Sequence, residues 1–114
     1  MPFTVSENRS YSQSKEAVHA AALESITAGL EGSILEQDDG RIEGKFPKTI
    51  RGKVLGDRTH IEIELQATAN GETAVAAEVY PLDPLGRKLQ FGARKGVSST
   101  VMSWFWAHLE HRLD

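Results

Sequence analysis

The sequence THIEIELQATANGETAVAAEVY, residues 59–80, consists of two alternating arms joined by a turn. In the first arm Ile61, Ile63 and Leu65 alternate with polar residues, which is the period of a strand with one buried and one solvent-facing side. The Asn-Gly dipeptide at 70–71 is a strong short-range signal for a β-hairpin. We therefore predict two antiparallel strands here, and the other elements are placed around them.

The register of this hairpin follows from which side chains must share the buried face. A two-residue loop would set Ile63 opposite Glu78 and bury a carboxylate beside isoleucine. A three-residue loop, residues 69–71 with Gly71 in the left-handed conformation, sets Ile63 opposite Ala77 instead. Because a slip of one residue turns every side chain to the other face, the apolar pattern favours the three-residue loop.

The composition is that of one ordinary globular domain. A chain of 114 residues, 39% hydrophobic and 25% charged, fits a single domain over residues 1–114. The absence of cysteine excludes disulfides, thiolate catalysis and zinc–thiolate sites. The chain shows no signal-peptide pattern or membrane-length apolar run, and its net charge of −3 gives no overall attraction to nucleic acid or anionic lipid. We expect a cytoplasmic protein that binds neither nucleic acid nor membrane.

Helical periodicity marks two segments, one near each end of the chain. In the first, apolar residues recur every four positions after Ser14, a candidate N-cap, and Gly32 stands where a glycine would end the helix. The recurring residues are Val18, Ala22, Ile26 and Leu30. The second helix runs to Leu113, with Ser98 or Ser99 as its N-cap.

Further strands are indicated by alternation and by turn residues. They cover residues 3–11, 34–37, 41–46, a segment starting at position 49, and 88–93. An Asp-Asp-Gly sequence between the second and third of these signals a second hairpin. A third hairpin, with a two-residue loop at 56–57, sets Ile50 opposite Ile63 on the buried face. The same register sets Arg51 opposite Glu62 on the outer face.

The resulting order is β-α-β6-α, an α+β fold in which a curved antiparallel sheet packs against two helices. This order resembles the helix-grip fold of the START and polyketide-cyclase-like superfamily along the whole chain, with one first helix in place of the usual pair. The resemblance implies a cavity that binds a hydrophobic ligand, which some members use for catalysis. A second architecture fits the same order: an open sheet with both helices on one face and no cavity, like one half of a TATA-binding-protein repeat.

The last helix has an apolar surface that is too wide for one contact. Its apolar residues cover roughly 200° of arc, about twice the stripe of an ordinary surface helix. One flank must pack on the sheet, and the other needs the first helix, a ligand or a second subunit. We predict Phe105 and Leu109 in the core and Trp106 at the rim. Trp104, Trp106 and His19 are the candidates for contact with a ligand or partner.

His19 lies inside the apolar arc of the first helix. Two interpretations are open: a buried acid–base group, whose pKa burial would shift, or a histidine at the edge of the core with its hydrogen bonds satisfied.

A glycine-rich loop that leads into the last helix is a candidate anion site. Free N–H groups and the positive end of the helix dipole favour an anion at such a place. Arg94, Lys95, Ser98 and Ser99 would contact it. The loop is not a Walker A sequence, because Lys95 precedes Gly96 instead of following it.

Two other groups of residues have ordinary explanations. His108 and His111 could supply only two metal ligands, so we predict no metal site, and no cofactor motif is present. Glu62, Glu64 and Glu78 point outward on strands and are predicted to form a solvated, salt-bridged face.

Three hypotheses for function remain. The first is a non-catalytic domain that binds a hydrophobic ligand or a protein partner at its helix–sheet groove. The second is a self-associating module, a homodimer through the aromatic face of the last helix. The third, ranked last, is an enzyme that uses a cavity histidine, because no nucleophile–base pair is readable in the sequence.

Overall fold

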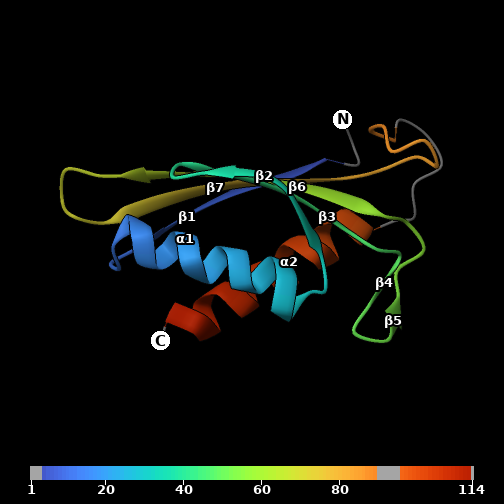
Figure 1. Cartoon of the computed structure of the whole chain (residues 1–114), viewed down its shortest axis with the longest axis horizontal. Helices are drawn as coiled ribbons and strands as arrows, with labels where there is room; N and C mark the ends of the chain where they lie inside the picture. The colour runs from blue at the N-terminus through green and yellow to red at the C-terminus, as the bar shows by residue number, and fades with distance from the viewer. Residues whose placement is uncertain (1–3, 90–95, 114) are drawn as a thin grey trace.

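Two helices lie on one face of an antiparallel sheet in the computed structural model of the chain, which describes residues 4–89 and 96–113 (Figure 1). The sheet has five strands in the order β1-β7-β6-β3-β2, so it is open, with β1 and β2 at its edges. The elements are β1 (Val5–Tyr11), α1 (Lys15–Glu24), the π-helical turn η1 (Ser25–Gly29), β2 (Ser33–Asp38), β3 (Arg41–Phe46), β4 (Thr49–Ile50), β5 (Lys53–Val54), β6 (Thr59–Ala67), β7 (Thr73–Pro81) and α2 (Val97–Leu113). The predicted α+β class, an antiparallel sheet packed against two helices, is confirmed.

The central hairpin has the predicted register. Ile63 lies opposite Ala77 and Leu65 opposite Val75. Gly71 has a φ of 83°, the left-handed conformation that the three-residue loop requires. The inward residues of both strands are buried, which is the reason that the apolar pattern could select this register.

The predicted hairpin around residues 56–57 is wrong. The strand that pairs with β6 on its other side is β3, which sets Ile42 opposite Ile63 and Gly44 opposite Ile61. Ile50 instead belongs to a small separate ribbon, β4–β5. Arg51, expected opposite Glu62, lies in the turn of that ribbon.

The reason for this error is a short duplication in the sequence. Residues 42–45 and 50–53 both read Ile-X-Gly-Lys, so either segment matches the apolar face of β6 equally well. The turn between β4 and β5 prevents residues 50–53 from pairing with β6. Arg51 and Gly52 have φ values of 50° and 83°, which close a two-residue hairpin within it.

The first helix starts as predicted but ends differently. The Ser14 hydroxyl accepts a hydrogen bond from the Ala17 N–H at 3.2 Å, which confirms the N-cap. At the other end α1 passes into η1, and the left-handed residue is Glu31, with a φ of 63°. Gly32 is needed for a different reason, because a Cβ there would lie 2.6 Å from the Phe46 ring.

The last helix begins earlier than predicted. Val97 is its first residue and Gly96, with a φ of 81°, precedes it. Ser98 and Ser99 are therefore inside the helix and do not cap it. Lys88 forms an isolated bridge with Leu82. Residues 90–93 of the predicted last strand lie outside the described part of the chain.

The core lies between the sheet and α2. Phe105 and Leu109 are fully buried, as predicted. Trp106 is also buried, with 1% of its surface exposed, so its predicted place at the rim is wrong. The second cover that α2 needs comes from the protein itself: the helix contacts α1 and η1 on one side, and β7, β6 and β1 on the other. Trp104 is half-buried.

We predict that Trp106→Ala lowers the free energy of unfolding by about 3–5 kcal/mol, because it removes a large, fully buried side chain. Trp104→Ala, which truncates a half-buried side chain of the same type on the same helix, should cost distinctly less. Urea unfolding of the two variants and the wild type measures both values. Equal losses in the two variants would contradict this assignment of Trp106 to the core.

Candidate ligand-binding groove

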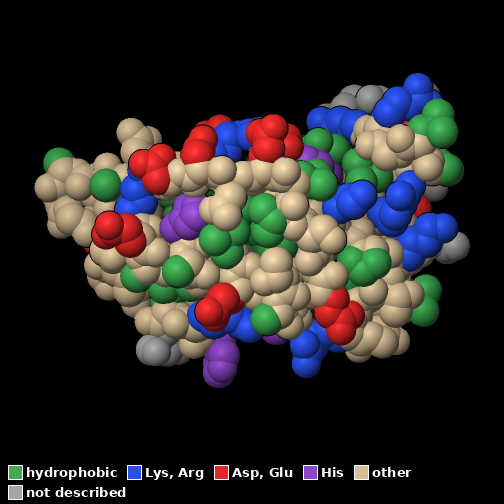
Figure 2. Space-filling model, in the orientation of Figure 1, with side chains coloured by type: hydrophobic (Ala, Val, Ile, Leu, Met, Phe, Trp, Pro, Cys, Tyr) green, Lys and Arg blue, Asp and Glu red, His purple; other side chains and the backbone are tan. Residues whose placement is uncertain are grey.

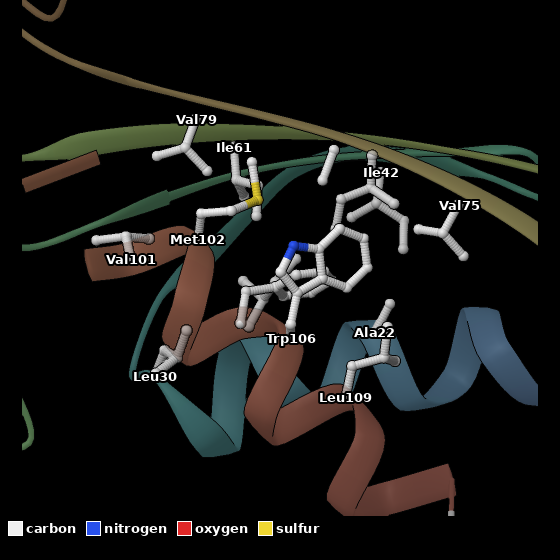
Figure 3. Packing of buried hydrophobic residues seen from close by; sticks show 14 of the residues in the cluster. Ala22, Leu30, Ile42, Ile61, Val75, Val79, Val101, Met102, Trp106 and Leu109 are labelled. Carbon is white, nitrogen blue, oxygen red and sulfur yellow. The ribbon is translucent and has the colours of Figure 1, made fainter. Parts of the chain in front are cut away.

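The space between α2 and the sheet is filled by side chains. Figure 3 shows Met102 and Trp106 directed from α2 toward the sheet residues Ile61 and Val75. All four of these residues are at most 1% exposed. A ligand could enter this region only by displacing core residues, so a ligand site has to be sought at the margins of the helix–sheet interface.

Polar contacts close the margin along β1. The Trp106 indole N–H donates to Glu7 Oε1 at 2.8 Å. The Arg9 guanidinium lies 4.9 Å from the centre of the Trp106 ring and donates to Glu110 Oε2 at 2.6 Å. The Tyr11 hydroxyl donates to the same carboxylate oxygen at 2.9 Å. Burial, followed by this hydrogen bond, raises the pKa of the Tyr11 hydroxyl well above its usual value.

The margin along β2 is open. A groove of about 640 Å³ lies between α1 and the end of β2, where the chain turns toward β3. The residues that line it are Lys15, Glu16, His19, Gln37, Asp38 and Asp39. We name this the α1–β2 groove. Of the three residues predicted to contact a ligand or partner, it contains His19.

His19 crosses the groove from the helix to the strand. Its Nε2 lies 2.6 Å from the backbone oxygen of Asp38. Because a carbonyl oxygen can only accept, the ring nitrogen at this contact is the donor. In the neutral ring this leaves Nδ1 as an acceptor for another group. Of the two interpretations of His19, the structure supports the half-buried edge residue with a satisfied hydrogen bond.

The three residues predicted to contact a ligand are not brought together. His19 lines the α1–β2 groove, Trp106 is in the core, and Trp104 is half-buried on α2. Lys15 and Gln37, which also line the groove, were not predicted as site residues. The i, i+4 spacing of Lys15 and His19 along α1 was the available signal for placing them on one side of the helix.

The outer face of the sheet carries a histidine that the sequence analysis missed. His60 is 8% exposed and stacks on Tyr80, with 4.7 Å between ring centres. Its Nε2 lies 3.3 Å from Glu43 Oε1. The signal was present, since the predicted hairpin register already sets residue 60 opposite residue 80.

The salt-bridged outer face has different partners from those predicted. Glu62 accepts a hydrogen bond at 3.1 Å from Arg41, not from Arg51. Arg41 also pairs with Glu43, and this hydrogen bond holds the pKa of the Glu43 carboxyl below its usual value. The same face has a shallow hollow of about 450 Å³ over the short side chains of Ala74 and Ala76. The α1–β2 groove is larger and lies between a helix and a strand.

The predicted anion site cannot be assembled from the described residues. Arg94 and Lys95 lie outside them, Ser98 is buried in the first turn of α2, and Ser99 is exposed. Within residues 4–89 and 96–113 no group of three metal-binding side chains occurs. Over the same residues, no helix is both long and apolar enough to cross a membrane.

His108 has a structural role at the contact between the two helical segments. A Cβ at Gly29 of η1 would lie 2.7 Å from His108 Nδ1, so the chains approach closely there. Nδ1 accepts a hydrogen bond from Arg112 at 3.2 Å. Burial, followed by the charges of Arg112 and Arg51, lowers the pKa of the His108 ring.

Solved structures share this architecture. The chain matches protein MLL2253 from Mesorhizobium loti with a TM-score of 0.61 and 18% identity, over 97% of this chain and 96% of that one. It matches protein NE0264 from Nitrosomonas europaea with a TM-score of 0.58 and 12% identity, over 98% and 94%. It matches Ara h 8.0201 with a TM-score of 0.55 and 12% identity, over 96% and 97%. These likenesses show a shared helix-grip-like fold. No family model and no curated protein matches the chain.

The lowered pKa of His108 gives a prediction for the dependence of stability on pH. Above pH ~6.5 the ring is neutral in both the folded and the unfolded chain, and its contribution to stability is complete. As the pH falls from ~6.5 toward the lower folded-state pKa, the unfolded chain binds the proton first, so stability is lost. We expect His108→Gln to flatten this part of the pH dependence, measured by urea unfolding between pH 8 and pH 5.

His111→Gln is the control, because this exposed histidine lies on the same helix. Because the charge of His111 is the smallest of the causes that lower the His108 pKa, this variant should flatten the pH dependence much less than His108→Gln does. A His108→Gln variant whose stability falls with pH as steeply as that of the wild type would contradict the assignment.

Proposed function

We propose that this domain binds an amphipathic, mainly hydrophobic small molecule in the α1–β2 groove, without a chemical step, as a member of the START and polyketide-cyclase-like superfamily. The observation that supports this most directly is the groove itself, which lies at the open margin of the helix–sheet interface. Its volume of about 640 Å³ falls in the range of small-molecule sites.

The groove offers polar groups for one end of such a ligand. The free Nδ1 of His19 can accept a hydrogen bond, the Gln37 amide can donate or accept, and the Lys15 ammonium can pair with an anionic group. The aliphatic stem of Lys15 offers apolar surface beside its charge.

The lining favours binding over catalysis. None of the residues that line the α1–β2 groove is a serine, threonine or cysteine, so His19 has no hydroxyl or thiol to activate. One ring nitrogen of His19 already donates a hydrogen bond to the Asp38 backbone oxygen. The groove therefore supplies contacts that orient a ligand, and no nucleophile–base pair.

Binding of 8-anilinonaphthalene-1-sulfonate tests this proposal, followed by its fluorescence in titrations of the wild type and of His19→Trp. We expect the larger side chain to fill the groove and to weaken probe binding at least about tenfold, the loss of ~1.4 kcal/mol. His111→Trp is the matched control, because it makes the same change at an exposed position outside the groove. Native mass spectrometry of the freshly purified protein would then identify a retained small molecule.

Unchanged probe affinity in His19→Trp would remove the groove as the binding site. A dimer detected by sedimentation velocity, and dissociated by His19→Trp, would assign the groove to contact with a second copy of the chain. The homodimer predicted through the aromatic face of the last helix would lack Trp106 as a contact, because this side chain is buried in the core.

A further inference from the structure

One end of the molecule is basic although the whole chain is acidic. Residues 46–58 and 82–89 contain six cationic side chains and two carboxylates, whereas the net charge of the chain is −3. The cations are Lys48, Arg51, Lys53, Arg58, Arg87 and Lys88. In Figure 2 the blue side chains gather toward this end, on the right of the view. The charge of the chain is therefore unevenly distributed, with an excess of positive charge at one end of the long axis.

The same end presents two exposed aliphatic side chains. Val54 is 74% exposed in β5, and Leu85 is 76% exposed in the loop after β7. Figure 1 shows the β4–β5 ribbon and the loop after β7 at the same end of the long axis. Apolar side chains together with Lys and Arg also occur on the amphipathic helices that bind to the surface of anionic membranes.

Hydrogen bonds hold the two segments in place. Arg58, between β5 and β6, donates to the backbone oxygens of Asp83 and Pro84 at 2.9 and 3.0 Å. Asp83 Oδ1 in turn accepts from the backbone N–H of Leu85 at 2.9 Å. Leu85 therefore lies exposed in a hydrogen-bonded turn. Arg58 joins this turn to the segment that follows Val54.

Three lysines lie at this end of the molecule. No carboxylate of the described residues forms an ion pair with Lys48, Lys53 or Lys88. Lys88 lies 4.7 Å from the centre of the Tyr80 ring, and Arg87 is paired with Asp83. Among the described residues, the ammonium groups of Lys48 and Lys53 therefore have no ion-pair partner, and the ammonium group of Lys88 contacts only an aromatic ring.

We propose that this end of the molecule, formed by the β4–β5 ribbon and the loop of residues 82–88, docks on the surface of an anionic lipid membrane. Val54 and Leu85 enter the interfacial layer, and Lys48, Lys53 and Lys88 contact the lipid headgroups. The aliphatic character of the two tips favours lipid over single-stranded nucleic acid, whose bases are usually held on aromatic side chains. The attraction acts locally, within a Debye length of the surface, so the net charge of the chain does not prevent it.

Co-sedimentation with lipid vesicles tests the docking. Vesicles of phosphatidylcholine, with and without phosphatidylserine, are compared at low and high salt. We expect the wild type to sediment with the phosphatidylserine vesicles and to be released by salt. Lys48→Gln with Lys53→Gln should weaken binding about fivefold for each charge, hence roughly 25-fold together. Val54→Ser with Leu85→Ser should weaken it roughly tenfold, mainly in the part that survives high salt.

A control with the same net charge separates local from overall electrostatics. Gln66→Glu with Ala69→Glu lowers the charge by the same two units, but near the β6–β7 turn at the opposite end of the molecule (Figure 1). This variant should bind vesicles as the wild type does. His19→Trp should also bind as the wild type does, so failure of the groove proposal and failure of the docking proposal are distinguishable.

Three results would overturn the proposal. The first is no sedimentation with phosphatidylserine vesicles at low salt. The second is an equal loss of binding in the control variant, which would assign the effect to net charge. The third is release from vesicles by a single-stranded RNA that binds more tightly, which would identify a general polyanion site.

Discussion

The packing of Trp106 between α2 and the sheet is the contact on which the rest of the structure depends. Its ring belongs to the core cluster with Ile42 of β3 and Val75 of β7, and its one polar atom donates to Glu7. Because Glu7 comes from the first strand and Trp106 from the last helix, this contact joins elements that are far apart in the sequence. It also fixes which face of α2 is buried, so Phe105 enters the core with it.

The fold could be predicted wherever one choice of register buried only apolar side chains. The loop at residues 69–71 is such a case, since its alternative would have buried Glu78. The duplicated Ile-X-Gly-Lys at 42–45 and 50–53 is the opposite case, because both segments fit β6. The structure resolves it through the left-handed φ of Arg51, a conformation that residues other than glycine adopt infrequently. Nothing in the apolar pattern indicates that turn.

One residue of the candidate site could be predicted from the sequence. The groove itself could not, because it depends on how α1 and β2 pack in the tertiary structure. Helical spacing placed His19 on the correct side of α1, but the groove exists only because β2 is an edge strand that lies beside it. The pairing of His60 with Tyr80 was contained in the predicted register. Trp106 was misplaced because a helical wheel gives the direction of a side chain and not what covers it. In the structure α2 has protein on both flanks of its apolar arc.

The filled interior has a reason in the size of the chain. A domain of this length buries a smaller share of its surface than a larger one, and its folding free energy is of order 5–15 kcal/mol. Emptying an interior space of about 300 Å³, the lower end for a ligand site, would cost about 7 kcal/mol at roughly 24 cal/mol per Å³. That cost is comparable to the whole stability of the domain, so a helix-grip-like chain of 114 residues is driven to fill its core with side chains such as Trp106. Both proposed binding surfaces therefore lie outside the core. One is the α1–β2 groove at the open edge of the sheet, and the other is the basic end, where the connecting segments extend beyond the core.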